Sequence, residues 1–189
     1  IHWLDTRGGK YNRRIADGFP KVQGYGLLKL LKWIRLTGLV PSQSGFDSLG
    51  HVLFIKNERP DVYEKTFKFL EPMDYLTTRL TGKITGTQKT MVPFFIMDTR
   101  RWGHTGYHED LLKLAGVSKD KFPDLVPNDG VVGTLLPEVA AELGLNPNTQ
   151  VVAGISDSNA SLIGAGALDD FETLVYIGTS MYLTCHLPF

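Results

Sequence analysis

The sequence lacks the features that mark several large protein classes. One cysteine in 189 residues, Cys185, leaves no internal disulfide framework and no multi-cysteine zinc site. Twenty basic residues balance twenty acidic ones, so no net charge attracts nucleic acid or an anionic membrane surface. The most apolar stretch, residues 26–40, is interrupted by basic side chains and is shorter than the roughly 20 apolar residues of a membrane helix. The sequence therefore predicts a cytoplasmic protein with neither nucleic acid nor membrane as a partner.

Other absences narrow the chemistry. No Gly-x-Ser-x-Gly motif is present, which argues against an α/β-hydrolase. The five histidines do not combine with Cys, Asp or Glu in a metal-ligand spacing, so we expect no metal site built by the protein alone. The chain opens on Ile1 without an initiator methionine or a secretory signal. We therefore expect it to be an internal piece of a longer protein.

The composition is that of an ordinary globular protein, with 42% hydrophobic and 21% charged residues. Apolar residues at spacings of three and four, with Pro at helix starts and Gly at helix ends, predict a series of helices. These expected helices span residues 26–38, 46–57, 60–68, 72–80, 108–115, 137–143 and 157–165. In the first of them we expect the leucines and isoleucines to be buried and the basic side chains to face water. In residues 83–106 the apolar residues recur at no regular spacing, which predicts a loop with short strand pieces.

Strand patterns dominate the last forty residues. Residues 150–154 form a short apolar run typical of a buried strand, and residues 173–177 and 181–186 predict a hairpin in which Cys185 is half-buried. Strands alternating with a helix in this region indicate an α/β protein. Near the N-terminus, Trp3, Asp5 and Arg7 alternate as on a strand end, and the Asp–Arg pair is most simply structural.

Asp157 is the first candidate for chemistry. It follows the apolar strand and the turn at Gly154, at the point where a helix begins, and a helix N-terminus stabilises a carboxylate. The alternative is that Asp157 only caps the helix, a task that Ser156 or Ser158 could share. The spacing leaves both interpretations open.

The turn Gly178-Thr179-Ser180 between the last two strands is the second candidate. Its backbone N–H groups and hydroxyls could hold phosphate oxygens, although an ordinary hairpin turn has the same composition. A carboxylate followed about twenty residues later by such a turn supplies two parts that phosphoryl transfer needs. One part orients the attacking hydroxyl, and the other holds the transferred phosphate.

Taken in order, short motifs along nearly the whole chain resemble the FGGY family of carbohydrate kinases, and the xylulokinases within it. The motifs that carry the resemblance are Trp3-Leu4-Asp5-Thr6-Arg7, Glu58-Arg59-Pro60-Asp61-Val62-Tyr63, Pro72-Met73-Asp74-Tyr75-Leu76 with Arg79-Leu80-Thr81-Gly82, Val152-Ala153-Gly154-Ile155-Ser156-Asp157, Gly164-Ala165-Gly166 and Tyr176-Ile177-Gly178-Thr179-Ser180. The ordered series is far more specific than any one motif.

The resemblance implies an actin-like ATPase fold of the ribonuclease H-like type, with two α/β domains. Residues 1–168 would be the later part of the sugar-binding N-terminal domain, and residues 169–189 the opening hairpin of the nucleotide-binding C-terminal domain. The implied reaction is ATP-dependent phosphorylation of a sugar or polyol, first of all a pentulose such as xylulose, with Mg²⁺ neutralising charge. The implied partners are the sugar and ATP, and the oligomeric state is left open, with a homodimer as one possibility.

The resemblance also assigns roles to residues. Asp157 would be the general base, and Gly178, Thr179 and Ser180 would bind phosphate. Trp3 matches a position that contacts substrate in relatives. Relatives often carry Asn or Gln directly after the catalytic Asp, whereas this chain has Ser158 and then Asn159, which we expect beside the sugar.

Two departures from the sequence pattern of the family argue against kinase activity of this chain alone. The family's first phosphate loop, a D-x-G-T/S hairpin, and its Gly-rich adenosine site are both absent from the 189 residues. A non-catalytic sugar-binding or scaffold module with the same fold is therefore the alternative function. Retention of Asp157 and its phosphate turn favours the kinase.

Overall fold

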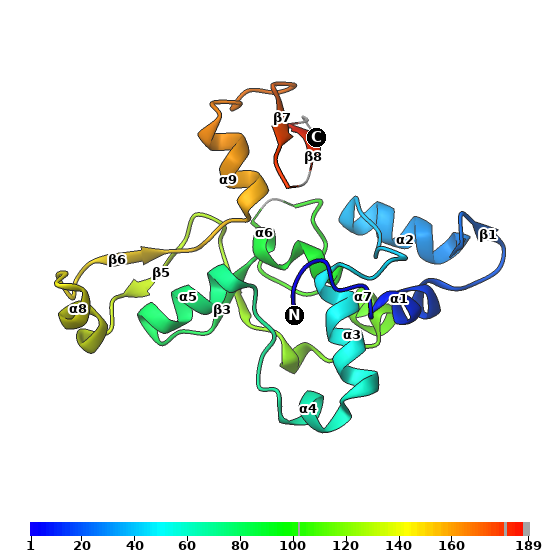
Figure 1. Ribbon diagram of the computed structural model, residues 1–189, viewed down its shortest axis with the longest axis horizontal. Helices are drawn as coiled ribbons and strands as arrows, with labels where there is room; N and C mark the ends of the chain where they lie inside the picture. The colour runs from blue at the N-terminus through cyan, green and yellow to red at the C-terminus, as the bar shows by residue number, and fades with distance from the viewer. Residues whose placement is uncertain (102, 180, 187–189) are drawn as a thin grey trace. The chain divides into compact units, whose positions relative to one another are not determined.

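The computed structural model describes residues 1–101, 103–179 and 181–186 (Figure 1). Its backbone contacts divide the chain into two compact units, Ile1–Gly154 and Ile155–Phe189. Both units combine helices with short strands, as expected for an α/β protein. The expected domain boundary between residues 168 and 169 falls inside the second unit and stays a prediction.

The first unit is mostly helical. Its helices are α1 (Gly9–Ala16), α2 (Leu27–Thr37), α3 (Ser48–Glu58), α4 (Pro60–Lys65), α5 (Pro72–Thr81), α6 (Gln88–Met91), η1 (Val92–Phe94), α7 (Glu109–Ala115), η2 (Lys119–Lys121) and α8 (Pro137–Leu143). Its strands are β1 (Lys21–Val22), β2 (Tyr25–Gly26), β3 (Thr85–Thr87), β4 (Asp124–Val126), β5 (Val131–Thr134) and β6 (Gln150–Val152). β1 pairs with β2 and β5 with β6 in antiparallel fashion, whereas β3 and β4 are parallel.

The helix boundaries follow local signals that the sequence carries. α2, α5, α7 and α8 each end at a glycine with positive φ, which is the left-handed conformation that closes a helix at low cost. α4, α5 and α8 each begin with proline, whose missing N–H is not needed in the first turn. Each of these expected helices is confirmed, with boundaries shifted by at most a few residues.

The main core lies among α1, α2, α3, α7 and the segment from α6 to Met97. Trp33, Leu49 and Ile96 have no exposed surface. Phe122 is surrounded by aromatic rings, with the centroid of Phe94 at 5.3 Å and that of Tyr107 at 5.8 Å. A smaller cluster, Leu135, Ala140 and Val151, joins α8 to the β5–β6 pair.

The expected apolar face of α2 is only partly buried. Leu36 is buried and Leu27 and Leu30 are half-buried, but Leu31 and Ile34 are exposed. Trp33, which the expected face did not include, is fully buried, and its indole donates a hydrogen bond to the carbonyl oxygen of Phe95 at 3.3 Å. The inward face of α2 is therefore rotated toward Trp33.

The sequence analysis missed α1, which contacts α3 through glycines. A Cβ added to Gly8 would lie 2.3 Å from the carbonyl oxygen of Gly50, and a Cβ on Gly50 would lie 2.6 Å from that of Gly45. We call Gly8, Gly9, Gly45 and Gly50 the glycine junction. The two helices approach so closely there that backbone packs directly against backbone.

Two further expectations need correction. The segment that carries Trp3, Asp5 and Arg7 is a turn rather than a strand end, because Asp5 N donates to the carbonyl oxygen of His2 at 2.9 Å. The stretch 83–106 contains the short strand β3, as expected. It also contains α6 and η1, which the sequence analysis missed. A capping box between Thr87 and Thr90 starts α6.

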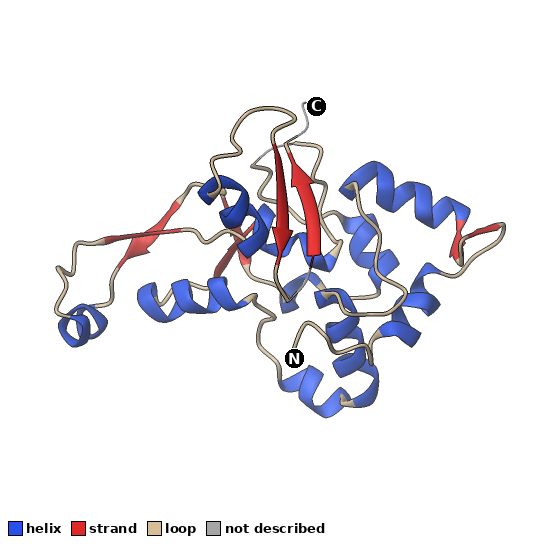
Figure 2. Cartoon of the chain, turned by 45° about the horizontal axis from the view of Figure 1, so that its top comes forward, coloured by secondary structure: helices blue, strands red, loops and turns tan. Residues whose placement is uncertain are grey.

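The second unit consists of α9 (Asp157–Gly164) and the hairpin of β7 (Thr173–Ile177) and β8 (Met181–Cys185) (Figure 2). The strands pair in antiparallel register, with Val175 opposite Leu183 and Ile177 opposite Met181. α9 packs against β7. The expected hairpin is confirmed, and Cys185 is half-buried on β8 as predicted. Among the described residues, no helix is long and apolar enough to cross a membrane.

Candidate functional site

The start of α9 presents Asp157 as an exposed carboxylate. Ser156 is the N-cap, and its hydroxyl accepts a hydrogen bond from Asn159 N at 3.4 Å. Among the described residues, the carboxylate of Asp157 accepts a hydrogen bond only from the neighbouring backbone, with Ser158 N at 2.7 Å from Oδ1. Since Ser156 is the capping residue, most of the hydrogen-bonding capacity of the Asp157 carboxylate faces solvent.

Ser158 and Asn159 lie in the same first turn and are half-buried. The hydroxyl of Ser158 lies 3.2 Å from that of Ser156. Together with Asp157 they make a small polar surface at the N-terminus of α9, where the positive end of the helix dipole favours an anion.

The turn between β7 and β8 belongs to the same compact unit. Gly178 and Thr179 are exposed at the tip of the hairpin, and Ser180 lies outside the described residues. Figures 1 and 2 both show the tip at the end of the hairpin that lies toward the start of α9. The fold thus brings the expected carboxylate and the expected phosphate turn to one end of one small unit.

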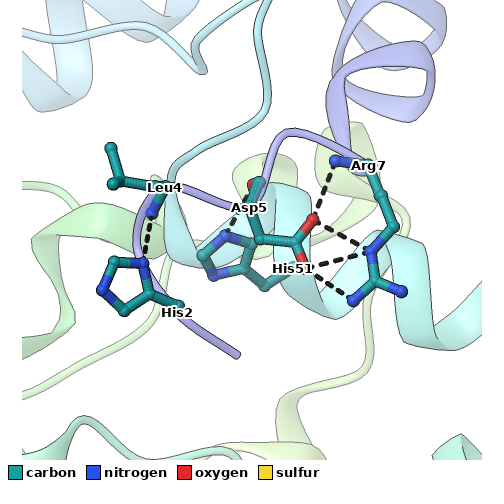
Figure 3. A network of polar contacts seen from close by, with 5 residues as sticks. All are labelled: His2, Leu4, Asp5, Arg7 and His51. Atoms are coloured by element: carbon teal, nitrogen blue, oxygen red, sulfur yellow. Dashed lines mark hydrogen bonds and ion pairs between the residues drawn. The ribbon is translucent and has the colours of Figure 1, made fainter.

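Trp3 belongs to the other unit, in the turn that precedes α1. Its indole is 51% exposed. The turn is fastened by Asp5, whose carboxylate accepts hydrogen bonds from Arg7 N at 3.0 Å and Arg7 Nη2 at 2.6 Å (Figure 3). These hydrogen bonds lower the pKa of Asp5 to about 2. His51 on α3 lies below, with Nε2 at 3.1 Å from the carbonyl oxygen of Asp5. The Asp5–Arg7 pair is therefore structural, as expected.

Trp3 lines a cavity of about 440 Å³ in the first unit. Phe46 and Phe94 contribute apolar walls, and His51 and Glu71 contribute polar groups. The carboxylate of Glu71 accepts a hydrogen bond from the Ser48 hydroxyl, and burial raises the pKa of Glu71. Sequence reasoning missed both polar groups, because His51 and Glu71 belong to different helical segments and form no local pattern.

The side chains at the start of α9 also have to suit Mg²⁺ and ATP, which the sequence resemblance implies. Mg²⁺ prefers oxygen ligands and is commonly held by one or two carboxylates together with substrate phosphates. The exposed carboxylate of Asp157 offers oxygen atoms of this type. Within residues 1–101, 103–179 and 181–186, no group of three His, Cys, Asp or Glu side chains could hold a metal ion. The protein side of the site thus fits a metal whose other ligands come from phosphate.

Comparison with known proteins decides the family. The model of the FGGY family of carbohydrate kinases, N-terminal domain, matches residues 27–164. The chain belongs to the FGGY family. Its resemblance to that family, inferred from short motifs, is confirmed.

Among FGGY relatives, xylulose kinase from Bacillus subtilis strain 168 is 34% identical over 180 residues, covering 95% of this chain and 33% of the relative. Ribulokinase from Staphylococcus aureus strain Mu3 is 34% identical over 142 residues, covering 72% of this chain and 25% of the relative. This FGGY chain therefore spans about a third or less of the length of these curated relatives.

A solved structure confirms the fold. The crystal structure of ligand-bound xylulose kinase from Lactobacillus acidophilus matches 97% of this FGGY chain and 34% of that chain, with a TM-score of 0.78 and 21% identity. The α/β fold is thus that of the FGGY sugar kinases, which is the actin-like fold expected from the motifs.

Proposed function

We propose that this chain is part of an ATP-dependent kinase that phosphorylates a hydroxyl group of a sugar or polyol, with the pentulose xylulose as the first substrate to test. Family membership supports the reaction class. The substrate class rests on relatives named xylulose kinase and ribulokinase. We expect the protein in the cytoplasm.

The observation that carries the proposal is the state of Asp157. Ser156 caps α9, so Asp157 is not needed for the cap, and its carboxylate lies exposed at a helix N-terminus. An exposed, hydrogen-bond-poor carboxylate can accept a proton from a sugar hydroxyl as that hydroxyl attacks the γ-phosphate of ATP. In this role Ser158 and Asn159 would contact the sugar. The family resemblance implies Trp3, in the other unit, as a separate substrate-contacting residue.

The turn of Gly178, Thr179 and Ser180, of which Gly178 and Thr179 are exposed, would receive the phosphate. Backbone N–H groups and hydroxyls in such a turn hold phosphate oxygens, and holding them in line with the attacking oxygen supplies much of the catalysis. Mg²⁺ bound to ATP would neutralise charge on the phosphates.

The test is Asp157→Asn in the full-length protein that contains this chain, with steady-state kinase activity and thermal unfolding measured together. If Asp157 is the base, kcat falls by at least about a hundredfold while the melting temperature hardly changes, because Asn keeps the shape and loses the proton acceptor.

Asp61→Asn is the matched control, since Asp61 is another exposed aspartate in the first turn of a helix, α4. This variant should retain parental kcat. Near-parental kcat in Asp157→Asn with an intact fold would remove Asp157 from the mechanism and favour a binding module.

A further inference from the structure

A cavity of about 380 Å³ in the first unit lies between α2 and the segment that leads into α7. Basic side chains line it from both sides, with Lys32 and Arg35 on α2 and Arg100 and His108 on the facing segment. Among the described residues that line it, Asp110 is the only acidic one. We call this space the basic cavity.

The α2 side of the basic cavity is fixed by the core. Lys32 and Arg35 are three positions apart, so they share one side of the helix. Leu31 and Leu36 also line the cavity and give it apolar surface. Because Trp33 is completely buried in the core, α2 cannot rotate to carry the basic side chains elsewhere.

The facing side is held by hydrogen bonds to its backbone. The side chain of Gln88 is 3% exposed, and its Nε2 donates to the carbonyl oxygens of Asp98 at 3.2 Å and Arg101 at 2.9 Å. Thr99 N donates to a carbonyl oxygen in the last turn of α2 at 2.8 Å. Arg100 is therefore held at the cavity before any ligand binds, which lowers the entropic cost of binding.

The ion pairs around the basic cavity leave one cation without a partner. Lys32 Nζ lies 2.9 Å from Asp110 Oδ2. Arg100 donates through Nε at 2.9 Å and Nη2 at 2.6 Å to the carboxylate of Asp98. Arg35 is exposed and makes no hydrogen bond or ion pair with the described residues. The cations thus outnumber the carboxylates, and the guanidinium of Arg35 is available to an anion.

His108 adds a polar group that also lacks a partner. Its backbone N–H donates to the carbonyl oxygen of Ile96 at 2.9 Å, which fixes the residue at the cavity wall. Nδ1 of its ring is buried and has no hydrogen-bond partner among the described residues. Buried polar atoms are nearly always paired, and a ligand oxygen in the cavity would give this nitrogen the partner it lacks.

We propose that the basic cavity binds a small phosphate dianion, either free or carried by a short phosphate ester. Guanidinium groups bind phosphate oxygens through pairs of parallel N–H donors. The volume of about 380 Å³ lies within the range of small-molecule sites. Leu31 and Leu36 offer apolar surface to the carbon chain of an ester. This site goes beyond the proposed kinase reaction and does not use Asp157.

A small anion suits the basic cavity better than a covering protein segment does. The buried centres of protein interfaces are depleted of charged side chains, lysine among them. A polypeptide cover would take Arg35 out of water and would have to supply a carboxylate to pair with it. A small dianion neutralises the guanidinium and leaves the cavity in contact with water.

The test is binding of inorganic phosphate and of glycerol 3-phosphate to the full-length protein that contains this chain, measured by calorimetry at constant ionic strength. Arg35→Gln should raise the dissociation constant at least about tenfold, because the charge-assisted contact is lost. Asp110→Asn should lower it roughly threefold, since this change frees Lys32 for the ligand. A misfolded variant would not gain affinity. Tighter binding of glycerol 3-phosphate would identify the ester as the ligand, and the reverse order would identify the free ion.

Arg14→Gln is the matched control, since Arg14 is another exposed arginine in the last turn of a helix, α1, and does not line the cavity. This variant should bind phosphate like the parent. Binding that Arg35→Gln leaves unchanged would overturn the proposal and place the phosphate elsewhere, for example at the turn after β7. No binding at millimolar phosphate would also overturn it, and would indicate that a protein segment fills the cavity. Neither result bears on the kcat of Asp157→Asn.

Discussion

Asp74 and Asp157 both lie in the first turn of a helix, but the fold gives their carboxyl groups opposite environments. Asp157 is exposed, whereas Asp74 on α5 is 2% exposed and its Oδ2 has no hydrogen-bond partner among the described residues. Burial raises the pKa of Asp74 to about 6, although a hydrogen bond from the Thr90 hydroxyl opposes the shift. The nearby carboxylate of Glu71 raises it further.

This shift predicts a pH-dependent stability. The pKa of Asp74 is higher in the folded state than its ordinary value of 3.8, so its contribution to stability is complete below pH 3.8 and is lost as the pH rises through about 6. Asp74→Asn removes the ionisation and should stabilise the protein at pH 7 by about 2 kcal/mol. Urea unfolding of parent and variant at pH 5 and pH 7 measures the effect, and an equal difference at both values would contradict it.

At this scale the sequence identified Asp157 but not the burial of Asp74. Asp157 stands beside a local signal, the end of an apolar strand and the start of a helix. The environment of Asp74 comes from distant segments, since its Oδ2 lies 3.3 Å from the position of a Cβ on Gly86 and its charge acts on Tyr107. No local pattern encodes such contacts.

Among the elements, helix ends were predictable and helix faces were not. Proline and glycine fix the ends of α5 and α8 through backbone conformation alone. The buried face of α2 depends on the part of the core that holds the Trp33 indole. Residues about sixty positions away in the sequence form that part of the core. α1 is short, and it combines glycine contacts with the packing of Tyr11, Ile15 and Ala16 against the core.

We expect the N-cap of α3 to contribute more to the free energy of unfolding than the N-cap of α9. Asp47 is 8% exposed and accepts hydrogen bonds from Gly50 N and Ser42 N, both at 2.7 Å, and from Asn12 Nδ2. Asp47→Ala should cost about 2 to 3 kcal/mol, since it leaves several buried donors unpaired. Ser156→Ala should cost about 1 kcal/mol. Chemical denaturation that ranks the two in the reverse order would be inconsistent with this network.

Hydrogen exchange should differ sharply between elements. A two-stranded hairpin is marginal in water, so the amides of β7 and β8 should exchange fast at concentrations where the chain is monomeric. The amides of α3 around Leu49 and Val52 should exchange slowly, because these side chains are buried in the main core. Uniform protection of both elements at low concentration would show that the hairpin is more stable than its packing indicates.

At the scale of the whole molecule, the order of motifs predicted the family and the fold although no single motif was decisive. Matches to residues 27–164 in the family model and to 97% of the chain in a solved structure confirm both. The polar groups of the Trp3 cavity remained beyond sequence reasoning, because His51 and Glu71 meet there only through folding.

The 189-residue chain alone is expected to be inactive as a kinase. A D-x-G-T/S phosphate hairpin is absent from its sequence, so the γ-phosphate would meet one of two cradling turns. Positioning and electrostatics supply nearly all the catalysis of phosphoryl transfer. Xylulose-dependent ADP release, assayed against a blank without sugar and with circular dichroism confirming the fold, should not exceed the blank. A signal above it would contradict the prediction.

The glycine junction has a consequence for how this protein can vary. Where side chains separate two helices, substitutions can adjust the spacing by a methyl group at a time, and one change can compensate another. Gly8, Gly9, Gly45 and Gly50 leave no such adjustable part between α1 and α3, since any added Cβ would lie within 2.7 Å of backbone. Direct backbone contact therefore fixes the distance between α1 and α3, and substitutions cannot adjust it gradually. A side chain at any of these four glycines would therefore displace α1, and the turn that carries Trp3, relative to α3.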